Sequence, residues 1–343
     1  MSQSSFDFDA PAPAPAPAAV APAQSPSAAT AADVPAADSL EDMARALEQH
    51  ADYRVLRRLV PVTDYGPAPA PAQAGVRQVL LLDTETTGLS HPADKIIELA
   101  MLLVQVDVAT GLPFGPVECF EGFEDPGMPI PATAREVTGI SDDMVRGQRL
   151  DDAQVQAMVA RADLMVAHNA GFDRPFVETR FPVFADKAWA CSFADIDWKA
   201  AGAGSSKLSA LAQDQGWFYD AHRALVDCHA LLQVLCRPVG PGAGAGTGLG
   251  QLMAVASKAS YRLRATGSPF ESKDLLKARG YRWDAEAKVW GCNLPDEKRL
   301  EAELAWLKAE VYGGRRGARV DVERLDSRVR YAKRSGEFAQ REL

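Results

Sequence analysis

Two carboxylates two residues apart end the most apolar short segment of the chain. The segment VLLLDTET places Asp83 and Glu85 at the end of a predicted strand, and residues two apart on a strand project from the same face. Two like charges in a buried site are costly unless a cation neutralises them. Hard divalent cations prefer such oxygen ligands. The pair therefore indicates a metal site, with an ordinary acidic turn as the alternative for so short a motif.

Two further segments supply acids that can meet this pair. MVAHNAGFDRPFV places Asp173 just beyond a short apolar strand and at the start of a helix, where a strand-to-helix turn can present it at the carboxyl edge of a sheet. HRALVD supplies His222 and Asp227. Five residues along a helix correspond to about 500°. These two side chains therefore converge only if His222 lies on the loop before the helix.

The segments DTETTGL, AHNAGFD and HRALVD, in this order, resemble the three motifs of the DEDDh family of 3'-to-5' exonucleases, which includes the proofreading epsilon subunit of bacterial DNA polymerase III. The resemblance covers about half the chain and includes PIPATAREVTGISDDMV. It implies an α/β, ribonuclease-H-like exonuclease fold with a mixed central sheet. It also implies that Asp83, Glu85, Asp173 and Asp227 hold two Mg²⁺ or Mn²⁺ ions and that His222 is the general base.

The implied reaction is the removal of nucleoside monophosphates from a 3' end, in which His222 deprotonates a metal-activated water for an in-line displacement. Single-stranded DNA is the favoured substrate, and a replication or repair protein is a possible partner. An exoribonuclease is one alternative, because discrimination depends on how the pocket treats a 2'-hydroxyl. A non-catalytic nucleic-acid-binding or scaffold protein on the same fold is the other. The presence of all five expected catalytic residues argues against the second alternative.

The residues expected to line the terminal nucleotide complete the first motif or end the short strand: Thr86, Thr87, Gly88, Leu89, His168 and Asn169. A glycine permits close backbone approach, and an apolar side chain can wedge against a base. An ordinary turn is the simpler interpretation of the first four. For His168, as for His229, structural hydrogen bonding is favoured over a role as the base, because neither has the relation to an acid that His222 has.

The charge of the chain is unevenly distributed. The formal net charge is -9, yet residues 251–343 carry 20 Lys and Arg against 14 Asp and Glu, so attraction for phosphates is expected in the C-terminal part. Five cysteines without zinc-like spacing indicate reduced thiols. The absence of a long apolar run or a leader-like N-terminus predicts a cytoplasmic protein without membrane contact.

Composition divides the chain into six parts. In order, they are a disordered Ala/Pro-rich tail (1–37), an accessory helix (38–65), the exonuclease domain (76–237), a Gly-rich linker (238–250), a small basic α+β domain (256–325) and an Arg-rich tail (326–343). In the small domain, Trp283 and Trp290 alternate with basic residues such as Lys273 and Lys288. A stacking platform for nucleic acid fits this pattern. In so small a unit, however, a role in the core is favoured for the tryptophans.

Overall fold

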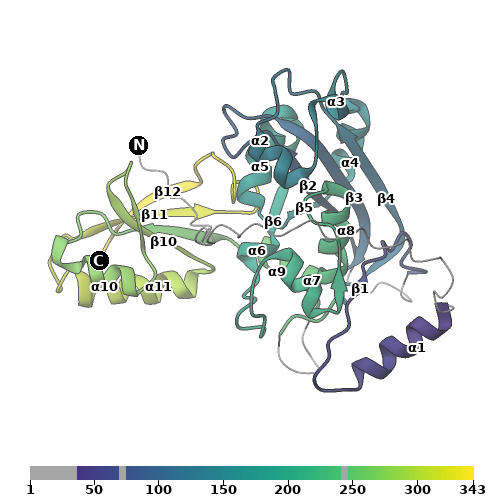
Figure 1. Ribbon diagram of the computed structural model, residues 1–343. Coiled ribbons are helices and arrows are strands. Elements are labelled where there is room, and N and C mark those ends of the chain that lie inside the picture. Colours follow the sequence, from purple (N-terminus) through teal and green to yellow (C-terminus); the bar gives the residue numbers. More distant parts are fainter. Residues whose placement is uncertain (1–36, 69–74, 241–245) are drawn as a thin grey trace, which may run out of the picture. The chain divides into compact units, whose positions relative to one another are not determined.

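The computed structural model describes residues 37–68, 75–240 and 246–343 (Figure 1). Residues 1–36 of the predicted Ala/Pro-rich tail (1–37) and the middle of the predicted linker lie outside the described residues. The chain divides into two compact units, residues 1–55 and residues 56–343. Among the described residues, no helix combines the length and the apolar character that crossing a membrane requires.

The described part of the first unit is built around helix α1 (Ala37–Glu48). Its apolar side chains Leu40, Met43 and Leu47 are 45%, 48% and 41% exposed. The expected helix over 38–65 therefore ends much earlier than expected. Arg57 instead begins the short strand β1 (Arg57–Arg58), which pairs in parallel with β7 (Trp217–Phe218). Backbone pairing with another strand overrides the local helical pattern here.

The second unit contains a five-stranded mixed sheet with strand order β4-β3-β2-β5-β6. Its strands are β2 (Val76–Thr86), β3 (Ile96–Asp107), β4 (Pro113–Phe123), β5 (Leu164–Ala167) and β6 (Ala188–Cys191). The first three form an antiparallel meander joined by turn-rich segments. Strands β5 and β6 run parallel to β2, because helices separate them along the chain. The mixed central sheet predicted from the sequence is confirmed.

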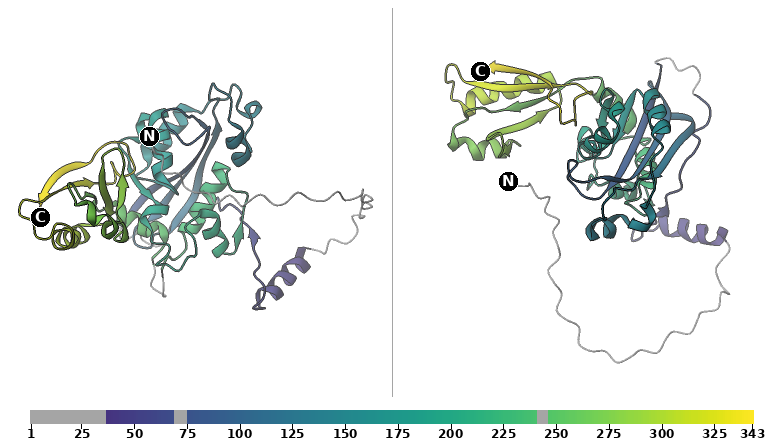
Figure 2. Two further views of the ribbon diagram at one scale, coloured as in Figure 1. Left: turned by 60° about the vertical axis from the view of Figure 1, so that its left-hand side comes forward. Right: turned by 90° about the horizontal axis from the view of Figure 1, so that it is seen from above.

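Helices cover both faces of this sheet (Figures 1 and 2). On one face, Leu80 and Leu82 pack with residues of α4 (Asp152–Arg161) and α5 (Ala170–Arg180). On the other, Val79 and Leu81 pack with residues of α7, α8 and α9. The bounds of these and the shorter helices are α2 (Ala132–Thr138), α3 (Asp142–Val145), α6 (Ser192–Asp195), α7 (Leu208–Asp214), α8 (Ala224–Leu235) and α9 (Gly248–Ala256). Alternate residues of β2 thus face the two helical layers.

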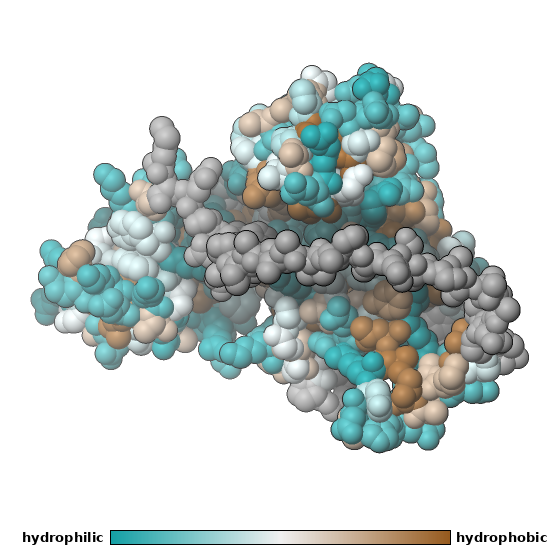
Figure 3. Space-filling view, viewed as in Figure 1, coloured by the Kyte–Doolittle hydropathy of each residue, from teal (hydrophilic) through white to brown (hydrophobic). Residues whose placement is uncertain are grey.

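The C-terminal domain is a five-stranded antiparallel sheet with strand order β12-β11-β8-β10-β9. Its elements are β8 (Ser260–Arg264), α10 (Lys273–Ala278), β9 (Arg282–Asp284), β10 (Val289–Leu294), α11 (Glu297–Trp306), β11 (Arg319–Leu325) and β12 (Glu337–Glu342). Both helices contribute to its core. In Figure 3 the visible surface of this domain is mainly hydrophilic. Strand β12 pairs with β11, so the end of the expected tail over 326–343 is instead part of this sheet.

The expected linker over 238–250 also requires correction. Helix α9 begins at Gly248, inside the Gly-rich stretch. Its residues Leu249 and Leu252 are buried in the same core as β2 and α8. A Cβ atom at Gly248 would lie 2.6 Å from Leu235 Cδ2, so a glycine is needed there for close packing rather than for flexibility.

A segment between β11 and β12 joins the two sheets. In this docking segment, residues 326–334, the Ser327 carbonyl accepts a hydrogen bond from the Trp189 backbone amide of β6 at 2.8 Å. Arg174 of α5 donates to the backbone carbonyls of Arg328 and Arg330. Tyr331 donates its hydroxyl to Asp195 at 2.5 Å. The C-terminal domain is therefore held against the first sheet by two segments: α9, which precedes β8, and the docking segment, which follows β11.

Candidate active site

Three carboxylates meet at the end of β2. Asp83 and Glu85 follow Val79 and Leu81 on the β2 face that packs toward α8, and Asp227 lies in the first turn of α8. One oxygen from each of the three lies within 4.8 Å of the others. Alternation along the strand and the start of the helix thus bring together residues that lie far apart in the sequence.

Asp173 approaches the same edge of the sheet from the other helical layer. It lies in the first turn of α5, directly after β5, which runs parallel to β2. Its Oδ1 accepts hydrogen bonds from the Thr84 backbone amide at 3.1 Å and from the Thr84 hydroxyl at 2.8 Å. Thr84 is therefore an anchor for Asp173, and the motif-based prediction did not include it. Its signal in the sequence is a hydroxyl between the two acids.

The acids strongly disfavour one another's ionised form. Burial raises the pKa of Asp83 well above its usual range, and the neighbouring charges of Asp173 and Asp227 raise it further. Burial, with Asp227 next, raises the pKa of Glu85 to about 8. Burial also raises the pKa of Asp227 although three hydrogen bonds favour its carboxylate. Such a set of oxygen donors fits a divalent cation, because a cation replaces the missing solvation and cancels the repulsion.

His222 lies on the loop before α8, as convergence with Asp227 requires. Its backbone has a φ of 69°, a left-handed conformation that is costly for a residue with a Cβ. Its amide donates to Asp227 Oδ2 at 2.8 Å, and the Arg223 amide donates to the same oxygen at 3.1 Å. Tyr219 donates to the other oxygen at 3.0 Å. Asp227 thus fixes the loop that presents the exposed His222 side chain.

A fifth acid, Glu98, lies beside the cluster and was not predicted. It pairs across the strands with Glu85, and its side chain is fully buried. Its carboxylate receives Arg223 Nη2 at 3.0 Å and the Ala224 amide at 3.1 Å. Glu98 therefore holds the start of α8 through the residue that follows His222. The available signal was a single charged residue within the apolar stretch IIELAMLLVQV.

We expect Arg223→Gln to lower the free energy of unfolding by about 2 kcal/mol, because it leaves Glu98 buried without its cation. The loss should stay below that for a fully enclosed pair, since the Arg223 side chain is 40% exposed. Urea denaturation of Arg223→Gln, Glu98→Gln and the double variant measures the coupling. The double variant should be more stable than the sum of the two losses predicts, and additive losses would contradict a pairwise role.

The loop after β2 is held by an internal network. Thr86 donates to the Gly88 carbonyl at 2.6 Å, and Thr87 donates to Asp94 at 3.0 Å. A Cβ atom at Gly88 would lie 2.6 Å from the carboxylate oxygens of Asp94. Leu89, in contrast, is 86% exposed. Of the four predicted residues on this loop, Leu89 is the one presented to solvent. Asp94, which the motif did not indicate, shapes the loop.

The two predicted residues at the end of β5 differ in their surroundings. His168 is engaged on both ring nitrogens, by the Ser192 hydroxyl at 2.7 Å and the Ser206 carbonyl at 2.9 Å. Burial lowers its pKa to about 4, so it is a neutral structural histidine. Asn169 is exposed, and its side chain does not cap α5. His229 is buried, and its Nδ1 has no hydrogen-bond partner among the described residues.

Comparison with known proteins places the site within a matched region. Residues 80–235 match the family model RNase_T, described as Exonuclease. The chain is 40% identical over 103 residues to "DNA polymerase III PolC-type" of Listeria welshimeri, covering 29% of this chain and 7% of that protein. It is 38% identical over 109 residues to the Bacillus subtilis protein of the same name, covering 30% and 7%. The chain therefore corresponds to a small fraction of the length of these relatives.

Two solved structures are similar in part. One is "Exonuclease X in complex with 5' overhanging duplex DNA", at 25% identity and a TM-score of 0.36, covering 46% of this chain and 89% of that one. The other is the zinc-bound Escherichia coli ExoI-ssDNA complex, at 18% identity and a TM-score of 0.38, covering 56% and 48%. The family match confirms the exonuclease resemblance and the ribonuclease-H-like fold predicted from the sequence. Residues 80–235 thus match the RNase_T exonuclease family, and this match supports the predicted resemblance to DEDD-type 3'-to-5' exonucleases.

Proposed function

We propose that this protein removes nucleoside monophosphates one at a time from the 3' end of single-stranded DNA in a metal-dependent hydrolysis. The observation that carries the proposal is the meeting of Asp83, Glu85 and Asp227 within 4.8 Å, inside the region that matches the exonuclease family. Asp173 joins them from α5 and raises the pKa of Asp83 further. The exposed residues Leu89 and His222 belong to the same matched region, residues 80–235.

The four acids would hold two Mg²⁺ or Mn²⁺ ions. When bound, such ions lower the pKa of a water and stabilise the attacking and leaving oxygens of an in-line displacement. The protein's own contribution is to hold the four carboxylates close together despite their repulsion. Thr84 fixes Asp173, and the three donors to Asp227 fix that carboxylate. These contacts orient the ligands before the substrate arrives.

His222 would take the proton of the attacking water on one ring nitrogen. A general base must be free to accept a proton and must be held near the reacting group. The side chain of His222 is exposed, while its backbone is fixed by Asp227. His168 cannot take this part, because both of its ring nitrogens are engaged. The strained φ of 69° is a further sign that the position of His222 is functional.

We expect His222→Gly to slow nucleotide release by about a hundred- to ten-thousand-fold, the usual contribution of a general base. Glycine adopts a φ near 69° without steric cost, so the loop and the amide bond to Asp227 should remain. Quantification of mononucleotide released at successive quenched time points measures the rate, and thermal denaturation shows whether the variant keeps its stability. Added imidazole should restore part of the rate, because it can enter the space left by the side chain.

The matched variant is His222→Ala, which removes the same imidazole but keeps a Cβ in the left-handed region. It should lose activity like His222→Gly, and its free energy of unfolding should be about 1 kcal/mol lower than that of His222→Gly. A His222→Gly variant that keeps most of the wild-type rate would remove His222 from the mechanism. That outcome would not contradict the proposed metal site.

The preference for DNA is part of the proposal. The curated relatives are DNA polymerases by name, which supports DNA and a replication or repair protein as partner. Matched DNA and RNA oligomers, single- and double-stranded, with and without Mn²⁺, test it directly. Faster release from RNA would make the enzyme an exoribonuclease, and no metal-dependent release from any oligomer would leave a binding or scaffold protein. The cytoplasmic location stays a prediction from the sequence.

A further inference from the structure

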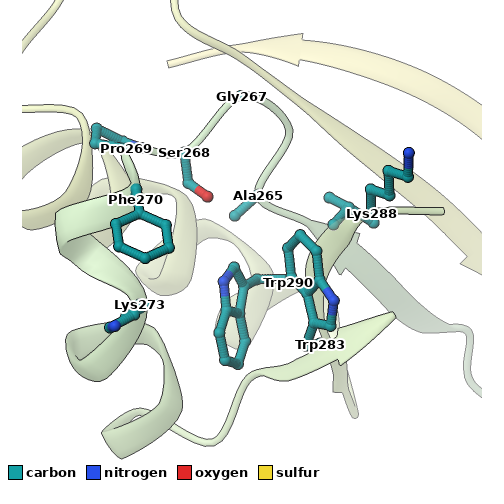
Figure 4. A pocket seen from close by; sticks show the side chains of 10 residues that line it. Ala265, Gly267, Ser268, Pro269, Phe270, Lys273, Trp283, Lys288 and Trp290 are labelled. Atoms are coloured by element: carbon teal, nitrogen blue, oxygen red, sulfur yellow. The ribbon is translucent and has the colours of Figure 1, made fainter. Parts of the chain in front are cut away.

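The C-terminal domain contains an open pocket of about 350 Å³ that the exonuclease site does not use. It is lined by the turn between β8 and α10, by the start of α10, and by the hairpin of β9 and β10. Figure 4 shows the rings of Phe270, Trp290 and Trp283 gathered at this opening, with Trp290 between the other two in this view. The pocket therefore has aromatic walls contributed by three separate elements.

These aromatic rings are presented to solvent to an unusual degree. Trp283 is 51% exposed and Phe270 is 76% exposed. Trp283 and Trp290 are cross-strand partners, with ring centroids 5.6 Å apart and planes inclined by 59°. Trp290 packs partly against the core of the domain, whereas the outer face of Trp283 has no such cover. The favoured core role thus holds in part for Trp290 and fails for Trp283, which remains available for stacking on a ligand.

The charges around the pocket select the kind of ligand. Lys273 and Lys288 lie toward opposite ends of the aromatic group (Figure 4), and none of the described residues that line the pocket is acidic. A cationic ligand is disfavoured, because two ammonium groups would repel it. A flat aromatic group that carries an anion satisfies both the rings and the lysines. A nucleotide has this combination.

The backbone conformation of Lys288 indicates that a lysine is useful at this position. Its φ is 52°, in the left-handed region where glycine or asparagine is usual in a hairpin turn. A lysine there costs stability that a glycine would not. Such a cost points to a use for the side chain itself.

We propose that this pocket binds single-stranded nucleic acid, with one base stacked on Trp283 and adjacent phosphates near Lys273 and Lys288. The inference rests on the proposed function in one respect, that the bound strand is also the strand from which nucleotides are removed. The +6 formal charge of residues 251–343 would extend the attraction along the backbone of the strand. The pocket is then a second contact for the substrate, at a place other than its 3' end.

A circular oligomer of deoxythymidine separates this contact from the catalytic one, because it has no 3' end. We expect the full-length protein in EDTA to bind a labelled 30-residue circle in a fluorescence anisotropy titration. Trp283→Ala should weaken binding about ten-fold, a loss typical of one stacked base, and Trp283→Phe should fall between the two. Lys288→Gly should weaken binding and flatten its salt dependence while keeping or raising thermal stability.

Two control variants remove similar groups elsewhere in the domain. Phe338→Ala deletes an aromatic ring that is 59% exposed on β12, the opposite edge of the sheet from β9. Lys308→Ala deletes an exposed cation beyond α11. Both should bind the circle like wild type. Equal affinity of wild type, Trp283→Ala and Lys288→Gly for the circle would overturn the proposal, whatever other ligand the pocket takes.

Release of mononucleotides from a linear 3' end by the wild-type protein with Mn²⁺ tests the proposed function separately. Binding to the circle that depends on Trp283 supports the pocket even if no nucleotide is released. Nucleotide release with no Trp283-dependent binding confirms an exonuclease and removes the pocket from its substrate path.

Discussion

Replacing Asp83 by asparagine should reduce nucleotide release about a thousand-fold or more while making the metal-free protein more stable at pH 8. The loss of rate follows because Asp83 is a proposed ligand for ions that supply several kcal/mol of charge stabilisation, and each 1.36 kcal/mol corresponds to ten-fold in rate. The gain in stability follows because burial and the neighbouring carboxylates disfavour the ionised form of Asp83, whereas an amide does not ionise. Asparagine has nearly the same volume, so packing should be unchanged.

The sign of the pH dependence follows from the raised pKa values. The pKa of Glu85 is about 8 in the folded protein, against about 4 for an unfolded carboxyl group. Between these values the folded state binds more protons than the unfolded state, so the stability of the metal-free protein should fall as pH rises through this window. Divalent ions should reverse this loss, because they replace the protons at the same carboxylates.

Thermal denaturation in EDTA at pH 5 and pH 8, with and without Mn²⁺, measures this balance. Asp83→Asn should melt above wild type at pH 8 and close to it at pH 5, and Mn²⁺ should raise the melting temperature of wild type more than that of the variant. Asp186→Asn, at an exposed carboxylate outside the site, serves as the control and should follow wild type throughout. An Asp83→Asn protein that is inactive but less stable at pH 8 would show that the acids are not held in mutual repulsion.

The acids of the site were accessible from the sequence because their pattern is local. Asp83 and Glu85 share one strand face, and the five-residue spacing of His222 and Asp227 allows the two to converge only if His222 lies on the loop before the helix, where the structure has it. Glu98 was missed because its role depends on the register that places it opposite Glu85. Thr84 and Asp94 were missed for the same kind of reason, since Thr84 acts through hydrogen bonds to a residue distant in the chain and Asp94 through hydrogen bonds across a turn. Roles that depend on pairing between elements are not encoded in the spacing of a motif.

The domain boundaries failed where composition was taken as a guide to flexibility. A Gly-rich stretch predicted a linker that ended at residue 250, yet Gly248 begins α9 and packs against Leu235. An Arg-rich stretch predicted a tail, yet it supplies the docking segment and β12. Most basic side chains of this stretch are exposed, as a solvated tail would have them, but Arg330 is only 5% exposed. Tertiary hydrogen bonds to backbone carbonyls decide these segments, and composition carries no information about them.

Arg174 is the residue on which this docking depends most, so Arg174→Ala should lower the free energy of unfolding by about 3 to 5 kcal/mol. Its side chain is completely buried and ion-paired to Glu178 at 2.5 Å. It also donates to backbone carbonyls of Ala185, Arg328 and Arg330. Alanine would remove this donor from the buried Arg330 carbonyl and leave Arg334 as the remaining partner of Glu178 and of the Ala185 and Arg328 carbonyls. Urea denaturation followed by circular dichroism gives the loss directly.

Arg334→Ala provides the matched comparison within the docking segment. Arg334 also pairs with Glu178 and also donates to the carbonyls of Ala185 and Arg328. Its side chain is 42% exposed, so water can replace it and the loss of stability should stay below about 1 kcal/mol.

Because Arg174 directly follows Asp173, weakening the docking segment should also lower the affinity for Mn²⁺, measured by calorimetry at a temperature where the variant remains folded. A C-terminal domain that acts only as a tether predicts a smaller loss of stability, from the contacts of Arg174 with Glu178 and Ala185 alone, and no change in Mn²⁺ affinity. Equal stability and equal Mn²⁺ affinity of Arg174→Ala and wild type would therefore return the C-terminal domain to the status of an independent appendage.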